Sequence, residues 1–204
     1  MKQLVISPHI DDDVLGCGGV INSETLTLYC GVDEFHIVTK EDRLKEADNV
    51  RDFYGNQYKI LDNTIVNEYQ VKDLIDKFQG VINDYQPDRI FIPYPSYNQD
   101  HRVVYEACLI ALRPHDINFF VKKVLVYEQP HVFLWNNTHD MNGEFKPNYF
   151  QSIDIEKKIT AYKLMKSQVR DFRNDEDLKS MAKLRGTQSN NEYAESFQIL
   201  RWVD

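Results

Sequence analysis

A histidine followed by three adjacent aspartates lies near the amino terminus, within residues 7–13. The segment follows a short apolar run, residues 4–6, which predicts a buried strand, and it precedes glycines that can begin a helix. Adjacent carboxylates repel one another and stay ionised most readily when a cation lies among them. His9 and Asp12 are three residues apart on a tight turn and could share one metal ion. Imidazole with carboxylate is ordinary ligation for zinc and for other divalent first-row metals.

The two remaining aspartates have different predicted roles. Asp11 would lie beside the ion without binding it, a position that suits a general base acting on water. Asp13 would fall in the first turn of the following helix, where the helix dipole favours negative charge. A solvated acidic turn that caps a helix explains the same residues, and a single H-x-x-D motif produces many false matches. A second source of ligands is therefore needed.

That second source is a polar segment, residues 93–102, between a predicted strand and an amphipathic helix. The carboxyl ends of parallel strands share one edge of a sheet, so this segment can face the first. His101 then becomes the third ligand beside His9 and Asp12 and leaves one position open, as in catalytic zinc sites. Asp100 can orient an imidazole, and Asn98 offers an amide to a polarised substrate oxygen. Taken alone, Asp100 and His101 would more simply cap a helix.

The rest of the chain alternates between strand and helix patterns, which predicts an α/β fold with a mostly parallel sheet covered by helices on both faces. The length of 204 residues suits one domain, for which we expect a core over residues 1–128 and a small C-terminal subdomain over residues 129–204 that completes the site. The predicted strands are residues 4–6, 35–38, 58–61 and 89–92, and the predicted helices are residues 41–54, 71–85, the segment after residue 102, and 155–169.

Composition narrows the classes of partner. The chain is 42% hydrophobic and 27% charged, as in ordinary globular proteins, and its net charge of −8 disfavours nucleic acid or an anionic membrane surface. No run approaches the ~18 apolar residues of a membrane span, and no signal-peptide core is found. We therefore expect a cytoplasmic protein with a small-molecule substrate, and its three cysteines match no metal spacing and should be reduced. The oligomeric state stays open, a homo-oligomer included.

Several segments resemble the PIG-L or LmbE-like family of zinc-dependent N-deacetylases. The first is P-H-x-D-D-(acidic) after the first strand, and the second is D-H-R before a later helix. Others, in the same order as in the family, are Arg43-Leu44-Lys45-Glu46-Ala47, Val126-Tyr127-Glu128, Ile153-Asp154 with Lys157 and Lys158, Ser167-Gln168, Arg185-Gly186, and Tyr193-Ala194-Glu195-Ser196-Phe197. The resemblance covers the length of the chain.

The resemblance implies a Rossmann-like fold and zinc bound by His9, Asp12 and His101. It implies removal of the acetyl group from an N-acetylated amino sugar, such as an N-acetylglucosamine derivative, or from a conjugate of one. Attack would come from a metal-bound water, with Asp11 as general base and Asp100 in support. Arg43 is carried over as a substrate contact, with an ion pair to Glu46 or to a neighbouring acid as the alternative.

Two residues depart from the family pattern. Asp13 replaces the usual glutamate and keeps its charge. Asn98 replaces a histidine that is proposed to steady the oxyanion or protonate the leaving amine. An amide can donate a hydrogen bond but cannot titrate, so any general-acid role would move to another residue, and Asp11 could hand the proton it takes from water to the amine.

Aromatic residues and histidines gather in residues 129–150, a segment that could cover the site mouth or simply pack as a surface subdomain. Three competing functions remain. A dinucleotide-binding enzyme is disfavoured because Gly16-Cys17-Gly18-Gly19 is not G-x-G-x-x-G. A metallophosphoesterase would need cationic groups, and the sequence clusters none at either motif. A non-catalytic sugar-binding protein with a degenerate site is the third alternative, suggested by Asn98.

Overall fold

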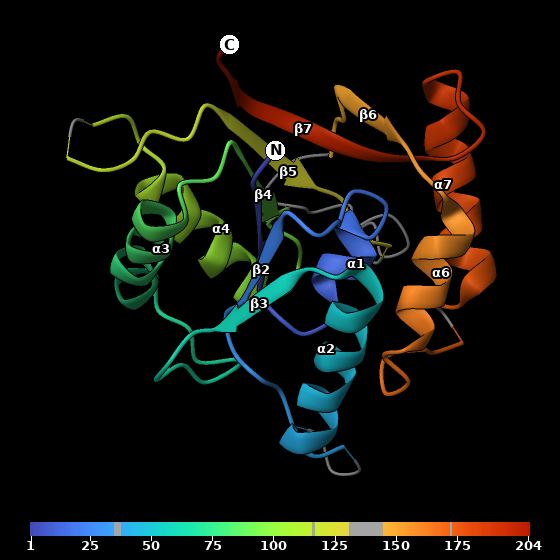
Figure 1. The fold of residues 1–204 in the computed structure, drawn as a ribbon, viewed down its shortest axis with the longest axis horizontal. Helices are drawn as coiled ribbons and strands as arrows, with labels where there is room; N and C mark the ends of the chain where they lie inside the picture. The colour runs from blue at the N-terminus through green and yellow to red at the C-terminus, as the bar shows by residue number, and fades with distance from the viewer. Residues whose placement is uncertain (35–37, 116, 131–144, 172) are drawn as a thin grey trace.

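The computed structural model describes residues 1–34, 38–115, 117–130, 145–171 and 173–204 (Figure 1). Within these residues the strands form one seven-stranded sheet in the order β3-β2-β1-β4-β5-β7-β6. The first five strands of that order are parallel, and β7 runs antiparallel to both of its neighbours. The strands are β1 (Gln3–Ser7), β2 (Thr25–Tyr29), β3 (Gln57–Ile60), β4 (Arg89–Pro93), β5 (Lys123–Tyr127), β6 (Tyr149–Ser152) and β7 (Ala194–Trp202). The predicted α/β class with a mostly parallel sheet is confirmed.

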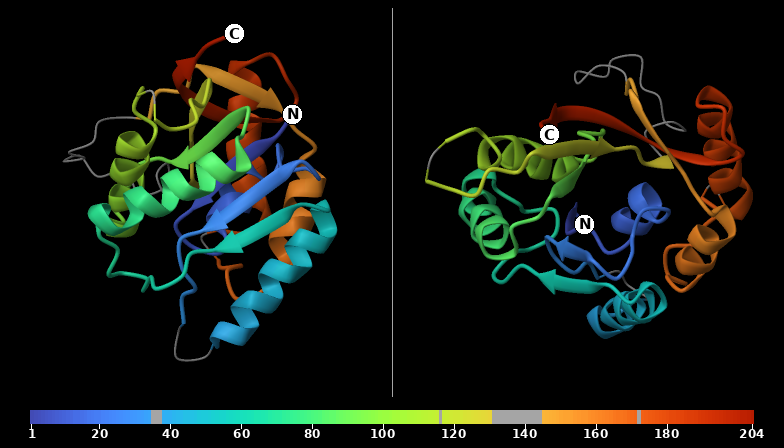
Figure 2. Two further views of the ribbon diagram at one scale, coloured as in Figure 1. Left: turned by 60° about the vertical axis from the view of Figure 1, so that its left-hand side comes forward. Right: turned by 45° about the horizontal axis from the view of Figure 1, so that its top comes forward.

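Helices cover both faces of the sheet, as predicted (Figure 2). Because side chains alternate along a strand, Leu4 and Ile6 of β1 join one core cluster and Val5 joins the other. The first cluster contains the apolar sides of α3 (Val71–Tyr85) and α4 (Gln99–Ala111). The second contains residues of α1 (Asp12–Cys17), α2 (Lys40–Tyr54), α6 (Ile155–Lys163) and α7 (Asp175–Gln188).

Local signals explain where α2 begins and ends. Thr39 and Asp42 form a capping box at its start, in which each side chain accepts a hydrogen bond from the backbone of the other. Gly55 ends the helix with a φ of 68°, a left-handed conformation that glycine adopts without steric cost. The predicted helix at residues 41–54 is therefore confirmed, as is the one at residues 71–85.

Two elements differ from the prediction. The second strand is β2, which the sequence analysis did not find; the strand expected at residues 35–38 falls mainly on residues outside the described ones, as do residues 131–144 of the aromatic segment. The helix expected at residues 155–169 ends at Lys163, because the chain turns back after it to form the hydrogen bond from Gln168 N to Met165 O. Val169 is 38% exposed and is not part of a packed helical stripe.

The C-terminal third extends the same sheet. β6 and β7 continue it beyond β5, and α6 and α7 cover one of its faces (Figure 1). The division into a core and a subdomain at residue 129 stays a prediction.

The order of the strands creates a crevice at one sheet edge. From β1 the chain proceeds outward through β2 and β3, and it then returns to the other side of β1 with β4. Parallel sheets bind ligands outside the carboxyl ends of their strands at such a reversal. The two polar segments of the sequence follow β1 and β4, so the fold brings them side by side.

Two further observations concern the thiols and the helices. Cys17, Cys30 and Cys108 are buried and form no disulfide, which agrees with the expected free thiols. In the described part of the chain, no helix has the length and apolar character needed to cross a membrane.

Candidate metal centre

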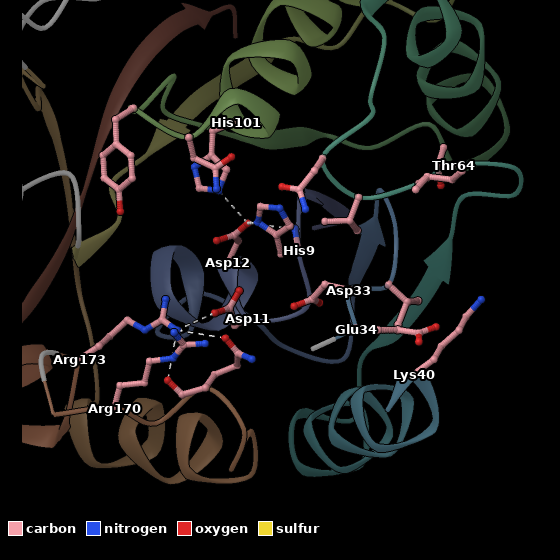
Figure 3. Close-up of a pocket in the computed structure, with 17 residues that line it drawn as sticks. His9, Asp11, Asp12, Asp33, Glu34, Lys40, Thr64, His101, Arg170 and Arg173 are labelled. Carbon is pink, nitrogen blue, oxygen red and sulfur yellow. Dashed lines mark hydrogen bonds and ion pairs between the residues drawn. The ribbon is translucent and has the colours of Figure 1, made fainter. Parts of the chain in front are cut away.

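Three potential metal ligands meet where β1 and β4 end. Nδ1 of His9 and Nε2 of His101 each lie 3.2 Å from the same carboxylate oxygen, Oδ2 of Asp12. One donor atom from each of the three residues can be chosen so that all lie within 4.8 Å of one another. Asp12 and His101 are buried and His9 is partly exposed, and the three side chains point toward one another (Figure 3). Two imidazoles and one carboxylate at this spacing fit a divalent first-row metal such as zinc.

Neighbouring groups fix the orientation of both rings. Oδ2 of Asp100 lies 2.9 Å from Nε2 of His9 and also accepts a hydrogen bond from the backbone nitrogen of Asn67. Oγ of Ser96 lies 3.1 Å from Nδ1 of His101. Each ring therefore presents its other nitrogen to Asp12, an arrangement that metal-binding histidines usually have. The imidazole that Asp100 contacts is that of His9, which follows the other strand, and not that of its sequence neighbour.

Electrostatics tie His9 and Asp12 together. Burial opposes protonation of His9, but hydrogen bonds to Asp100 and Asp12 outweigh burial and raise its pKa to about 10. Burial also disfavours ionisation of Asp12, but the positive charges of His101 and His9 hold the pKa of Asp12 well below its usual value.

Asp11 and Asp13 lie on either side of Asp12 but in different surroundings. Asp11 lines the cavity, and burial raises its pKa, although Arg173 opposes this with an ion pair of 3.2 Å. Asp13 lies in the first turn of α1, as predicted, but inside the core rather than in water. Tyr29 donates a 2.9 Å hydrogen bond to it, and burial raises its pKa to about 7.

Asn98 lines the cavity and is the N-cap of α4. Its Oδ1 accepts a 2.8 Å hydrogen bond from the backbone nitrogen of Asp100. The cap is thus Asn98 and not the Asp100–His101 pair considered from the sequence. Because Oδ1 is engaged, Nδ2 is the atom of this amide that can donate to a substrate oxygen.

Arg43 lies beneath the site. Its side chain is 0% exposed, and it pairs with Asp33 at 3.1 Å and with Glu46 at 2.8 Å. It also donates to the carbonyl of Ile10, next to the metal ligands. The ion pair that we weighed for Arg43 is present, and the side chain does not line the cavity. A direct substrate contact by Arg43 stays a prediction.

A cavity of about 770 Å³ opens in front of the three ligands. The sequence analysis identified His9, Asp11, Asp12, Asn98 and His101 on its wall but missed the others. They come from the loops after β2 and β3, from the segment before α4 and from the segment after α6: Val32, Asp33, Glu34, Lys40, Thr64, Ile65, Val66, Asn67, Tyr97, Gln168, Arg170 and Arg173.

Two of these loops could have been found, because they follow parallel strands and must reach the same sheet edge. The segment at residues 168–173 carries no such signal beyond the Ser167-Gln168 resemblance. The sequence clusters no cationic groups at either motif, and the cations of the site come from elsewhere in the chain. Lys40, Arg170 and Arg173 all line the cavity, because segments distant in sequence fold over it (Figure 3).

The parallel sheet, the strand order and the His-Asp-His group together define an α/β protein with the fold of the PIG-L or LmbE-type deacetylases. Solved structures support this statement at the level of the fold, whereas no protein-family model and no curated protein sequence matches the chain. The conserved protein TT1542 from Thermus thermophilus is similar with a TM-score of 0.81 and 22% identity, over 100% of this chain and 96% of the other.

Two further similar structures differ in activity. N,N'-diacetylchitobiose deacetylase from Pyrococcus horikoshii has a TM-score of 0.78 and 20% identity, over 98% of this chain and 84% of its own. GalB, the 4-carboxy-2-hydroxymuconate hydratase from Pseudomonas putida, has a TM-score of 0.76 and 21% identity, over 100% of this chain and 99% of its own. Deacetylases for teicoplanin and A40926 pseudoaglycone also share the fold. The fold is thus common among deacetylases but is not limited to them.

Proposed function

We propose that this protein is a metal-dependent N-deacetylase that releases acetate from an N-acetylated amino sugar or its conjugate. The observation that carries the proposal is the position of Asp11, a carboxylate on the cavity wall directly beside a His-Asp-His group. A general base next to a metal site is the arrangement that amide hydrolysis by water requires. The resemblance of the sequence motifs to the deacetylase family and the deacetylases among the similar structures support it.

His9, Asp12 and His101 would hold the metal, for which zinc suits the donor set best. A zinc ion in this place supplies Lewis acidity, which polarises the acetamide carbonyl and lowers the pKa of water. Asp11 accepts the proton of the attacking water and later delivers it to the departing amine. Nδ2 of Asn98 donates a hydrogen bond to the carbonyl oxygen as negative charge develops there. Asp100 keeps the ring of His9 in place.

The cavity supports a substrate larger than one small sugar. At about 770 Å³, it lies within the usual range for ligand sites and leaves room beyond an N-acetylated ring. Its wall mixes carboxylates and cations with apolar side chains such as Ile65 and Tyr97, which suits a sugar with an attached group. The expected cytoplasmic location, typical of proteins with free thiols, belongs to the same proposal.

A metallophosphoesterase is the second candidate, favoured by one observation. Lys40, Arg170 and Arg173 line the cavity, and cationic side chains near a metal are what a phosphate group needs. One observation counts against a phosphoesterase: Arg173, one of these three cations, already pairs with the carboxylate of Asp11.

Acetate release from a panel of N-acetylglucosamine derivatives is the first test, with zinc-loaded and chelator-treated protein compared. We expect zinc-dependent release, and a generic phosphodiester serves as the competing substrate. Asp11→Asn should keep the metal and lose most turnover, whereas His101→Ala should lose the metal. Arg51→Ala, a change in the last turn of α2 at a side chain that does not line the cavity, is the matched control and should behave as the wild type. Full acetate release by Asp11→Asn, or phosphodiester cleavage in place of acetate release, would overturn the proposal.

A further inference from the structure

Asp11 has an arginine partner from the other end of the chain. Nη2 of Arg173 lies 3.2 Å from Oδ2 of Asp11, whose side chain is only 6% exposed (Figure 3). Asp11 precedes α1, whereas Arg173 lies between α6 and α7. The ion pair holds one oxygen of the carboxylate, so Oδ1 is the oxygen that can face a reacting water.

The guanidinium of Arg173 is itself fixed in place. Its Nε donates a 3.0 Å hydrogen bond to the hydroxyl of Tyr162, a residue buried in α6. Its Nη2 donates to the backbone carbonyl of Gln168 at 3.2 Å and to the side-chain Oε1 of the same residue at 3.1 Å. A planar group held through both Nε and Nη2 has little freedom to rotate. Arg173 can therefore transmit a defined orientation to Asp11.

The segment that carries Arg173 is anchored to the opposite side of the site. The backbone nitrogen and the hydroxyl of Ser167 donate 2.7 Å hydrogen bonds to the two carboxylate oxygens of Glu46 on α2. Glu46 pairs with Arg43, and Arg43 donates to the carbonyl of Ile10, the residue before Asp11. The contacts thus form a closed path, which starts at the metal-ligand loop and returns to it through α2 and the segment after α6.

We propose that Arg173 is a positioning residue that holds the Asp11 carboxylate in the orientation needed to accept the proton of the attacking water. This inference rests on the proposed deacetylase function. In the step, an O–H bond of water breaks, its proton goes to Oδ1 of Asp11, and the oxygen forms a bond to the acetamide carbon while the π pair of the carbonyl moves onto its oxygen. That pair then re-forms the C=O bond as the C–N bond breaks, Asp11 returns the proton to the amine nitrogen, and acetate and the free amine are released. Arg173 keeps all its protons throughout.

The test compares Arg173→Ala with the wild type at matched metal content. Misplacement of a catalytic group by about 1 Å can cost on the order of 100-fold in rate, so we expect kcat to fall by roughly that factor while KM changes less than about threefold. Added guanidinium chloride should restore part of the kcat of Arg173→Ala, and the same concentration of sodium chloride should not. Asp11→Asn, which lacks the carboxylate that Arg173 pairs with, should gain no activity from added guanidinium. An unchanged kcat, a rise in KM alone, or no rescue by guanidinium would overturn the proposal.

A thermal-melting cycle tests the ion pair without any turnover. Arg173→Gln should lower the melting temperature in the wild-type background by more than in the Asp11→Asn background, because only the first leaves a buried carboxylate unpaired. Equal shifts in the two backgrounds would overturn the pairing and the proposal with it. Absence of acetate release by the wild type would refute the deacetylase function and the role of Arg173 in it, while the cycle would still decide whether the ion pair exists.

Discussion

Replacement of Arg43 by methionine separates two roles for this residue. The structure buries the guanidinium completely and gives it contacts to Asp33, Glu46 and Ser167 and to the carbonyl of Ile10. If these contacts matter, the substitution leaves two carboxylates without their cation and loosens the segment after α6. If Arg43 instead binds substrate, as the family resemblance implies, the folded state should hardly change.

The expected loss of stability follows from the burial of these groups. Removing one partner of a buried ion pair costs about 3–5 kcal/mol, because a charge is left uncompensated. Methionine fills much of the space left by the arginine stem, so we expect no large cavity term in addition. For a domain of this size, each kcal/mol shifts the melting temperature by about 2–4 °C. A loss of about 4 kcal/mol therefore predicts a fall of roughly 8–16 °C.

Thermal and urea unfolding of Arg43→Met at fixed zinc concentration measure this loss. Arg51→Met is the matched control, since Arg51 lies on the same helix and also pairs with two carboxylates, those of Asp48 and Asp52, but is 39% exposed. Water screens such a pair, so its loss should leave the midpoint near that of the wild type. A wild-type melting curve for Arg43→Met, together with a raised KM, would refute the reasoning and favour the substrate contact.

Three further outcomes are expected. The pKa of His9 is raised to about 10, and a histidine must be neutral to bind a metal, so zinc binding at pH 8 should release a proton and zinc affinity should fall as the pH is lowered. Calorimetry in buffers of different ionisation enthalpy measures this release, and a binding heat that does not depend on the buffer would contradict it. Gly16→Ala places a Cβ 2.2 Å from Cδ2 of Tyr127 and should lower the free energy of unfolding by about 1–3 kcal/mol in chemical denaturation. Gly80→Ala, with nothing within 4 Å of the new Cβ, should instead raise it by about 0.5–1 kcal/mol, and equal effects of the two changes would contradict the described packing of Gly16 on Tyr127. Asn98→Asp should keep the helix cap and a wild-type melting temperature but lose turnover. Asn98→Ala should lose turnover and also melt at a lower temperature, because the cap is gone. Retained turnover in Asn98→Asp would exclude the amide as a donor.

Much of the fold could be predicted because local and tertiary preferences agree in it. In α3 the apolar stripe that includes Leu74 and Phe78 is also the side that packs on the sheet. β2 was missed, although the alternation Thr25-Leu26-Thr27-Leu28-Tyr29 is itself a strand signal. The alternation would leave one face of the strand in water, but all five residues are buried because both faces of the sheet are covered. Only the packed sheet shows that Thr25 and Thr27 have partners inside the protein, such as the side chain of Gln3 for Thr25.

The proximity of His9, Asp12 and His101 could be predicted because they lie at the ends of two adjacent strands. β1 and β4 pair directly, and each polar segment follows its strand within a few residues. Arg173 could not be predicted in the same way. It follows no parallel strand, and its position depends on where α6 ends and on the contacts that Ser167 makes with α2. A contact of this kind becomes visible only when the whole chain is folded.

The activities of the similar structures bear on the contrast between the two strand-end motifs, which the sequence predicts, and Arg173, which it does not. One of them is a deacetylase and another a hydratase, although both share most of this fold. A scaffold that both activities share cannot by itself select the reaction. In this chain, the surroundings of the proposed base lie partly outside the two strand-end motifs, since Arg173 contacts Asp11 from a segment that those motifs do not include. If Arg173 orients the base, residues after α6 contribute to the orientation of Asp11, and the two strand-end motifs alone do not describe the surroundings of the proposed base.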